Sequence, residues 1–527
     1  MKNQSCGHSH IQRRTITALG GLATLFVLGT AYAFVGIVIT PVPSANPASG
    51  TQSNSVSPGY ELRQIVQGSD ALENPSGVIV QYGLLADGTK TEPDENLYLV
   101  FPHNPGGPTP GYDYGHHFLF QGHENAGDLA YVTRINLDVD DPAHRITLLT
   151  PPGTDGMTHF NSIDGSTWDP FTRTLLFTQE AGAKGGVIQV TPSWPPAVST
   201  LDGILGKGGF EGIHPDDDGA LYIIEDAGGT TVNVIQGDTT SPKTAKQPNS
   251  FVYRFLPFDR HDLEAGGKLQ ALQVSVEGNP VVFNAADPVG DVFANAQVKL
   301  HTPGTSWPIA WVTVHDTAVD GTASFSANAV AKLAGATPFK RPENLAFLPG
   351  SQFRTFFFDP TGDTDTTSGE QPDLAARGAY GSIFRVDLSH GGNRGRLSIF
   401  FLGDTVHNSF DNLTFADAST LLAAEDRGDT LHDELNTLDS VWAFDVARPG
   451  HAKRFIALGR DPLAAPTGAE DNEPTGLFVS EGAIDVGNML GTPLDRRAAH
   501  AFVTDQHGEN HTYAIVFDPD YDGDSDR

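Results

Sequence analysis

Residues 210–229 read FEGIHPDDDGALYIIEDAGG, and this stretch contains the unit that decides the fold. The carboxylate of Glu211 beside a glycine opens the unit, and a Pro/Asp/Gly turn separates two apolar runs. The second run ends in Glu225 and Asp226. Turn-forming residues between β-branched and aromatic residues predict two short antiparallel strands joined by a hairpin.

The same unit recurs along the chain. Its copies read FNSIDGSTWDPFTRTLLFTQEAG at 160–182, RPENLAFLPGSQFRTFFFDPTGD at 341–363, SFDNLTFADASTLLAAEDRGD at 409–429, and a longer form that begins EPTGLFVSEG at 473–508. A partial copy, HHFLFQGHENAG at 116–127, contributes only the second strand and its acid. Six copies predict an all-β fold, a six-bladed β-propeller with loop insertions, because repeats of this kind build blades around a central channel. The six strand ends carry Glu124, Glu180, Glu225-Asp226, Asp359, Glu425-Asp426 and Asp505.

The repeats also set the expected domain boundaries. We expect the propeller to occupy 59–517, with insertions within 230–340. Residues 41–58 are rich in Pro, Ser and Asn and predict a disordered linker. Residues 518–527 form an acidic tail.

The N-terminal residues 1–40 carry an export signal. An uncharged apolar run follows Arg13-Arg14, and the small-residue site Ala31-Tyr32-Ala33 lies within it. This pattern predicts a twin-arginine-type signal peptide. The alternative is a membrane anchor, since the uncharged run is long enough to span a bilayer. Both interpretations predict a periplasmic or extracellular protein, and the second adds a membrane tether.

The charge of the chain restricts its partners. Sixty-four acids against 32 bases give a formal net charge of −32. A field of this sign disfavours nucleic acid as a partner. It also repels a phosphate ester, unless bound cations reverse the sign locally.

The strand-end acids suggest where such cations bind. If the strand that ends in an acid is the innermost of its blade, its acid and the acid that opens the next unit face one mouth of the channel. Carboxylates that converge there must be protonated, hydrogen-bonded to strand-end amides or bound to cations. The alternative is that each acid–glycine pair merely forms a turn.

From about residue 110 to 515 the chain resembles the PhoX-type alkaline phosphatases, a family of exported six-bladed propellers. The similar stretches are TQEAG at 178–182, FEGIHPDDDGALYIIED at 210–226, YRFLPFDRHDLEAGGKLQALQV at 253–274, RPEN at 341–344, GAEDNEPTG at 468–476 and FVTDQHGE at 502–509.

The resemblance implies hydrolysis of a small-molecule phosphate monoester at iron and calcium ions in the propeller mouth. Arg341 and Glu211 are then the catalytic candidates, and Arg341 and His507 are the substrate-binding candidates. The expected metal ligands include Asp411, the acid that opens the copy at 409–429; the full set is Glu180, Glu211, Glu343, Glu473 and Asp411.

One position departs from the family pattern. The family's iron site uses a cysteine thiolate, whereas the matching residue here is Gln179 and the only cysteine of the chain is Cys6. A thiolate suits iron, and carboxylate and amide oxygens suit calcium. We therefore expect Ca²⁺, with Fe³⁺ the less favoured ion.

Two other functions fit the same residues. The chain can be a non-catalytic calcium-binding propeller, or a calcium-dependent esterase or lactonase, since one fold serves many chemistries. A closed propeller needs no partner to cover sheet edges, so we expect a monomer.

Overall fold

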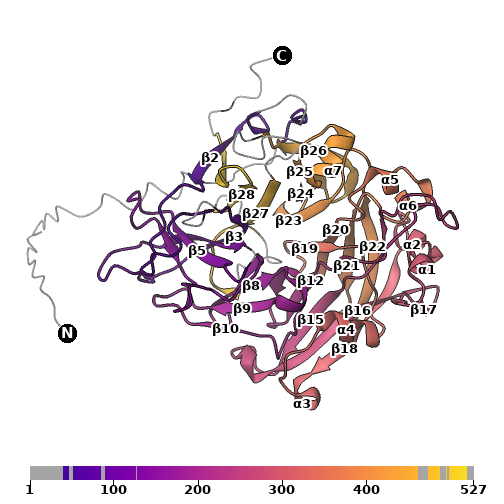
Figure 1. Cartoon of the computed structure of the whole chain (residues 1–527), viewed down its shortest axis with the longest axis horizontal. Helices are drawn as coiled ribbons and strands as arrows, with labels where there is room; N and C mark the ends of the chain where they lie inside the picture. The colour runs from indigo at the N-terminus through magenta and orange to yellow at the C-terminus, as the bar shows by residue number, and fades with distance from the viewer. Residues whose placement is uncertain are drawn as a thin grey trace, which may run out of the picture.

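The computed structural model describes residues 39–46, 52–84, 89–125, 127–460, 473–486, 494, 498–518 and 521. Nearly all of the predicted signal or anchor at 1–40, and most of the acidic tail at 518–527, lie outside the described residues. The described chain is mainly β-strand, with short helices between strands (Figure 1). None of its helices has the length and apolar character needed to span a membrane.

Most strands belong to six antiparallel units of four strands each. The first three units consist of β3 (Glu92–Val100), β4 (His117–Glu124), β5 (Tyr131–Asn136) and β6 (Ile146–Leu148); β7 (Ile163–Asp169), β8 (Thr174–Gln179), β9 (Gly186–Val190) and β10 (Val198–Thr200); and β11 (Phe210–Pro215), β12 (Leu221–Glu225), β15 (Val252–Pro257) and β16 (Gly267–Val276). The next three consist of β19 (Pro342–Phe347), β20 (Thr355–Pro360), β21 (Ser382–Leu388) and β22 (Arg394–Leu402); β23 (Phe410–Asp417), β24 (Thr420–Glu425), β25 (Ser440–Asp445) and β26 (Arg448–Ala457); and β27 (Glu473–Ser480), β28 (His500–Gln506), β29 (His511–Phe517) and β2 (Tyr60–Val66).

The last unit joins the two ends of the described chain. The N-terminal strand β2 pairs with β29, so that Leu62 lies opposite Ile515. An early strand thus completes a sheet that the C-terminal strands begin.

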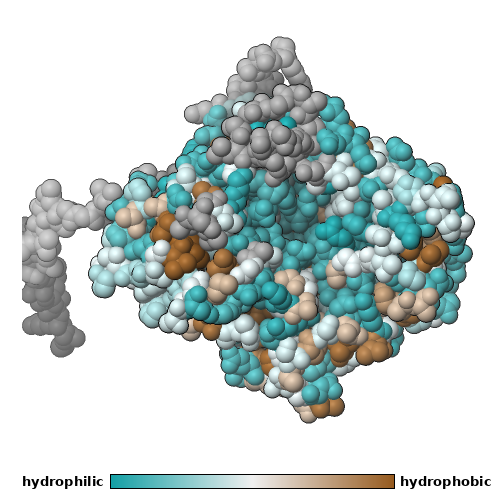
Figure 2. Space-filling model, in the orientation of Figure 1, coloured by the Kyte–Doolittle hydropathy of each residue, from teal (hydrophilic) through white to brown (hydrophobic). Residues whose placement is uncertain are grey.

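The first strands of the six units form a closed cycle of contacts. In the order β3, β7, β11, β19, β23, β27, each strand contacts the next, and β27 contacts β3. In Figure 1, β3, β19, β23 and β27 lie around the middle of the molecule, and Figure 2 shows that the visible face is hollowed and hydrophilic there. The innermost strand is therefore the one that carries the opening acid of each repeat. The expectation that the acid-terminated strand is innermost was wrong: that strand is the second of its unit, because the chain enters each sheet at the centre and moves outward.

The hydrophobic core lies between neighbouring units. One cluster combines Phe357 of β20 with Phe415 of β23, whose ring centroids are 5.4 Å apart. Another combines Leu119 of β4 with Phe502 of β28. Alternate side chains of a strand lie on opposite faces of its sheet. A sheet that is buried between two others therefore needs apolar residues on both of its faces.

The region 230–340, where insertions were expected, adds strands and helices to the third unit. β18 (Trp307–Asp316) pairs with β16 and β22 and so merges the third and fourth units into one ten-stranded sheet. The other elements here are β13 (Thr231–Val232), β14 (Ala245–Lys246), β17 (Asn279–Pro280), α1 (Pro288–Val292), α2 (Asn295–Leu300), α3 (Thr317–Asp320), α4 (Ala327–Leu333) and the 3-10 helix η3 (Leu263–Ala265). Outside it lie η2 (Gly182–Lys184), α5 (Thr366–Gly369), α6 (Pro372–Ala375) and α7 (Gly428–Leu435).

The composition of residues 41–58 predicted a disordered linker, and the part of it that the structure describes, 41–46 and 52–58, makes backbone contacts with a neighbouring sheet. The strand β1 (Ser55–Val56) pairs with β26, and the backbone N–H of Val42 donates to the carbonyl of Arg454 at 3.1 Å. The side chain of Val42 is buried. β26 is the outermost strand of its unit, so the backbone N–H and C=O groups on its outer edge have no partner within that unit. These groups can pair with an extended segment that runs beside the strand.

Candidate metal centre

Each first strand contains a β-bulge at the same place. The pairing with the second strand shifts at these bulges, which hold Asp94-Glu95, Asp164-Gly165, Glu211-Gly212, Glu343-Asn344, Asp411-Asn412 and Gly476-Leu477. In five of the six an acid is the first bulged residue, and in the sixth Thr475 precedes the shift. A bulge re-aims the side chain that it carries.

Two glycines bring neighbouring bulges close together. A Cβ atom on Gly165 would lie 2.3 Å from the carbonyl oxygen of Glu211, and one on Gly212 would lie 2.7 Å from Oδ1 of Asn344. Only glycine permits so close an approach. The acid–glycine pairs are thus more than turn formers, because they let the acids of adjacent units meet.

Seven carboxylates form what we call the carboxylate cluster. Ligand atoms within 4.8 Å of one another occur in three overlapping groups: Asp94, Glu124 and Asp164; Asp164, Glu180 and Glu211; and Glu211, Asp226 and Glu343. The structure therefore brings together three of the predicted ligands, Glu180, Glu211 and Glu343. Glu211 belongs to two groups and links them.

The other two predicted ligands lie beside the cluster rather than within these groups. The negative charges of Asp426 and Asp411 help to raise the pKa of Glu473, after burial as the main cause. Asp411 is half-buried, and its pKa is raised well above the ordinary value by burial and by the charge of Asp94. Both carboxylates therefore lie close enough to share the field of the cluster.

The cluster has strongly perturbed protonation. Burial raises the pKa of Glu180 to about 7, with a contribution from the negative charge of Asp226. Burial and the charges of Asp164 and Glu343 raise the pKa of Glu211 well above its ordinary value. Burial and mutual repulsion thus disfavour the charged form of these carboxylates, and bound cations would favour it.

This protonation predicts how stability depends on pH. A carboxylate whose pKa is higher in the folded state destabilises the fold once it must ionise, so stability falls as pH rises from the unfolded to the folded pKa. With a chelator present, we expect the melting temperature to fall between about pH 4.5, the ordinary value of a Glu, and about pH 7, the value of Glu180. Calcium should raise the melting temperature more at pH 8 than at pH 5. Thermal unfolding at both pH values measures this, and an equal calcium effect at both would contradict it.

Arg341 lies directly against the cluster. Its Nε donates to Oδ2 of Asp226 at 2.8 Å, and its Nη2 lies 3.6 Å from Oε1 of Glu343. Burial works against its charge, but the carboxylates of Glu343 and Asp226 outweigh burial and raise the pKa of the guanidinium. Its backbone has φ 52°, a strained conformation that persists only where the surroundings enforce it.

His507 lies at the rim of the same region. Its Nε2 is 3.5 Å from Oε1 of Glu92 and 3.9 Å from Oε2 of Glu473. The predicted substrate-binding histidine is therefore near one predicted metal ligand, but it is not part of the carboxylate cluster.

The acid doublets at strand ends divide into two roles. Glu225 accepts from the Tyr253 hydroxyl at 2.8 Å and ties strands together, whereas Asp226 joins the cluster. Asp359 likewise accepts from the backbone N–H of Asn344 at 3.0 Å. Successive side chains of a strand point to opposite sides, so only one acid of a doublet reaches the cluster. The expectation that every strand-end acid faces the mouth was therefore wrong for these residues.

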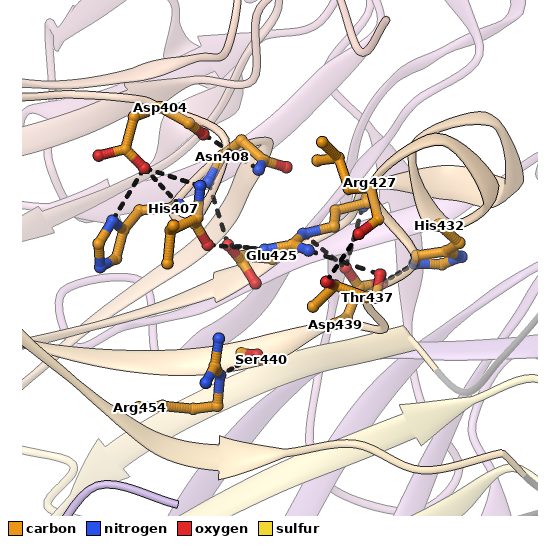
Figure 3. Close-up of polar contacts among 12 residues, drawn as sticks. Asp404, His407, Asn408, Glu425, Arg427, His432, Thr437, Asp439, Ser440 and Arg454 are labelled. Atoms are coloured by element: carbon orange, nitrogen blue, oxygen red, sulfur yellow. Dashed lines mark hydrogen bonds and ion pairs between the residues drawn. The ribbon is translucent and has the colours of Figure 1, made fainter. Parts of the chain in front are cut away.

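A buried ionic network surrounds Arg427 (Figure 3). Arg427 donates from Nη2 to Oε1 of Glu425 at 2.9 Å and to the carbonyl of Val406 at 2.8 Å. Nε2 of His432 on α7 lies 3.0 Å from Oδ2 of Asp439. The side chains of Glu425 and Arg427 are completely buried. Because Asp426 lies between them in sequence, the network fixes its backbone beside the cluster.

Sequence reasoning missed two members of the cluster. Asp94 lies in EPDEN at 92–96 and directly follows a proline, as Glu343 does in RPEN at 341–344. Asp164 precedes a glycine inside the copy at 160–182. Both signals were present, but the repeat was followed through its strand-end acids rather than through its opening acids.

The donor set suits a hard cation. All three groups offer carboxylate oxygens, and Oδ1 of Asp226 is buried without a hydrogen-bond partner among the described residues. Gln179, at the position of the family's cysteine, uses its side-chain oxygen to accept from the backbone N–H of Asn161 at 3.1 Å. Oxygen donors of this kind fit calcium or magnesium, so the residues present fit a divalent-cation centre.

Comparison with known proteins gives one family match. The family described as "Alkaline phosphatase PhoX" matches residues 216–478, which include Arg341, Glu343, Asp411 and Glu473. No curated protein matches the sequence.

Three solved structures are similar at low identity. A luciferin-regenerating enzyme shares 11% identity over 68% of this chain and 92% of its own, with a TM-score of 0.28. A puromycin-hydrolyzing peptidase of Mycobacterium tuberculosis shares 11% over 90% of this chain and 61% of its own, also at 0.28. A putative phosphatase from Bacteroides thetaiotaomicron VPI-5482 shares 8% over 90% and 98%, again at 0.28. Scores this low define neither the fold nor the activity of this chain.

Proposed function

Because this chain belongs to the PhoX alkaline phosphatase family, which it matches over residues 216–478, we propose that it is a metal-dependent phosphomonoesterase. The observation that carries the proposal is the convergence of seven carboxylates from four sheet units beside one arginine. A phosphate ester is a dianion, and a chain with net charge −32 needs local positive charge to accept it.

The proposed scaffold is a six-bladed β-propeller. Support comes from the six four-stranded units and from the closed cycle of contacts among their first strands. The opening acids then lie around the mouth of a central channel, and the late pairing of β2 with β29 closes the ring. Closure of this kind also supports the proposed monomer, because no inner edge is left to pair.

The proposed ions are calcium. Glu180, Glu211 and Glu343, with Asp94, Asp164 and Asp226, would hold them. Glu473 and Asp411, whose pKa values are raised by burial and by the charges of neighbouring carboxylates, are further proposed ligands. Divalent cations at this place supply positive charge for the phosphoryl oxygens and for an attacking water. Iron(III) is less favoured, because a thiolate donor is lacking among the described residues.

The protein's own residues orient the substrate. Arg341 presents a permanently charged planar group beside the cluster, a geometry suited to phosphoryl oxygens. Glu211 belongs to two carboxylate groups and would therefore be a ligand shared by neighbouring cations. His507 at the rim is placed to contact the substrate outside the phosphoryl group.

We also propose that the protein is exported from the cytoplasm. The uncharged run after Arg13-Arg14 supports export to the periplasm or beyond, either as a cleaved signal or as a membrane tether. Cell fractionation, with the N-terminus of the exported protein sequenced, distinguishes the two.

Removal of the Arg341 guanidinium tests whether the protein hydrolyses phosphate monoesters. We expect Arg341→Ala to lower kcat/KM for phenyl phosphate by about a hundredfold, the usual scale for one charge-stabilising donor. Arg385→Ala is the matched control, since Arg385 pairs with Asp387 away from the cluster. Calcium content is measured for both variants. Wild-type protein that cleaves phenyl acetate but not phenyl phosphate would point to the calcium-dependent esterase or lactonase. Calcium binding with neither activity would point to the non-catalytic propeller.

A further inference from the structure

The ammonium group of Lys246 is a second positively charged side chain in the electrostatic field of Arg341. It belongs to a segment inserted after β12. Residues 227–249 follow the strand end that carries Asp226 and contain the short strands β13 and β14. Lys246 is the last residue of β14, and its backbone N–H donates to Oδ1 of Asp363 at 2.9 Å. The backbone of Lys246 is thus held in one place.

One carboxylate, that of Asp363, is shared between two lysines, Lys340 and Lys246. The ammonium of Lys340 lies 2.9 and 3.0 Å from the two carboxylate oxygens of Asp363, in a pair whose members are both buried. The single negative charge of Asp363 therefore acts on both ammonium groups, so the two lysines together keep one positive charge in excess.

The Lys246 ammonium instead contacts a neutral group. Its Nζ donates to the hydroxyl of Thr364 at 2.9 Å. Thr364 follows a turn that is tied to the arginine, since the backbone N–H of Thr361 donates to the carbonyl of Arg341 at 2.8 Å. Burial, and after it the positive charge of Arg341, lowers the pKa of Lys246 to about 8, while the negative charges of Asp363, Asp226 and Glu343 act in the opposite direction. The Lys246 ammonium therefore lies in the electrostatic field of the carboxylate cluster.

The side chains of Lys246 and Arg341 contact different groups. Arg341 contacts Asp226 and lies near Glu343, two members of the cluster. Lys246, by contrast, is half-buried on the inserted segment, and its hydrogen bond goes to Thr364. An anion bound by Lys246 would therefore lie beside Thr364 and the inserted segment, whereas Arg341 faces the carboxylates of the cluster.

We propose that Lys246 binds a second anionic oxygen group, a carboxylate or a phosphate, on the leaving group of the substrate. The inference rests on the proposed phosphatase function and names its preferred substrate class: phosphate monoesters that carry an additional negative charge. In a chain of net charge −32 such substrates are repelled unless a local cation receives the extra charge.

The test compares substrates that differ in one group. Phenyl phosphate, 4-carboxyphenyl phosphate and benzene-1,4-diyl bisphosphate share one ring, and the last two distinguish carboxylate from phosphate. For wild-type protein we expect kcat/KM for at least one charged substrate to exceed that for phenyl phosphate by about fivefold to tenfold, as one charge-assisted hydrogen bond allows. Lys246→Met should abolish this ratio, and Lys246→Arg should retain most of it. Lys243→Met is the matched control, because Lys243 lies exposed three residues earlier on the same segment.

Each outcome decides the question. Loss of the ratio in Lys246→Met but not in Lys243→Met supports the inference. An unchanged ratio in Lys246→Met, or a parallel fall for all three substrates, overturns it while the phosphatase function stands. If wild-type protein hydrolyses none of the three, the proposed function fails and this inference fails with it.

Discussion

Glu211→Gln is expected to lower kcat/KM for phenyl phosphate by at least about a hundredfold. Loss of a group that merely orients a metal ligand already costs roughly 10- to 100-fold in affinity or activity, and Glu211 is itself a proposed ligand. It is also shared by two carboxylate groups, so one substitution disturbs two neighbouring cation positions. We expect bound calcium, measured by elemental analysis after dialysis, to fall together with the activity.

The control variant makes the same Glu-to-Gln substitution outside the carboxylate cluster. Glu264 is exposed on η3, and its side chain is remote from the proposed ligands in sequence and in fold. Glu264→Gln should leave calcium content and kcat/KM unchanged. A Glu211→Gln variant that keeps full calcium content and full activity would show that the convergence of carboxylates does not serve catalysis.

Arg427→Met is expected to lower the free energy of unfolding by about 3–5 kcal/mol, the usual cost when one partner of a buried ion pair is removed. The substitution leaves the completely buried carboxylate of Glu425 without its guanidinium and also removes the bond to the Val406 carbonyl (Figure 3). Urea unfolding with saturating calcium measures the change in stability.

Two further variants test whether burial of the ion pair causes the expected loss of stability. Arg448 forms an ion pair with Asp445 in the same sheet unit, but its side chain is 68% exposed, so Arg448→Met should have a much smaller effect. The double variant Glu425→Gln/Arg427→Met should recover part of the lost stability, since no unpaired charge is then buried. Equal destabilisation by Arg427→Met and Arg448→Met would contradict this account.

The network also bears on the metal centre. Asp426 lies between Glu425 and Arg427 in sequence, and Arg341 and His507 both act on its charge. A side chain is only as well placed as the backbone that carries it. Calcium affinity of Arg427→Met, measured by titration under conditions where the variant stays folded, is expected to fall along with its stability.

Much of the architecture could be predicted from the sequence alone. A turn flanked by two apolar runs, repeated with acids at constant places, predicted an all-β chain of similar units and a family resemblance that is confirmed over residues 216–478. These features are local, because hairpin turns and strand alternation depend on residues adjacent in the chain. The family resemblance pointed to Glu180, Glu211 and Glu343 as metal ligands, and the structure brings these three together.

The order of strands within each unit and the exact membership of the carboxylate cluster were decided only by the tertiary structure. Nothing local distinguishes Asp226, which joins the cluster, from Glu225, which ties strands together. Asp164 and Glu211 meet through neighbouring bulges whose close approach depends on Gly165. Turns and strand patterns arise from neighbours along the chain and can be predicted from it. A cation site made by several sheets depends on how those sheets pack, and packing is a property of the whole fold.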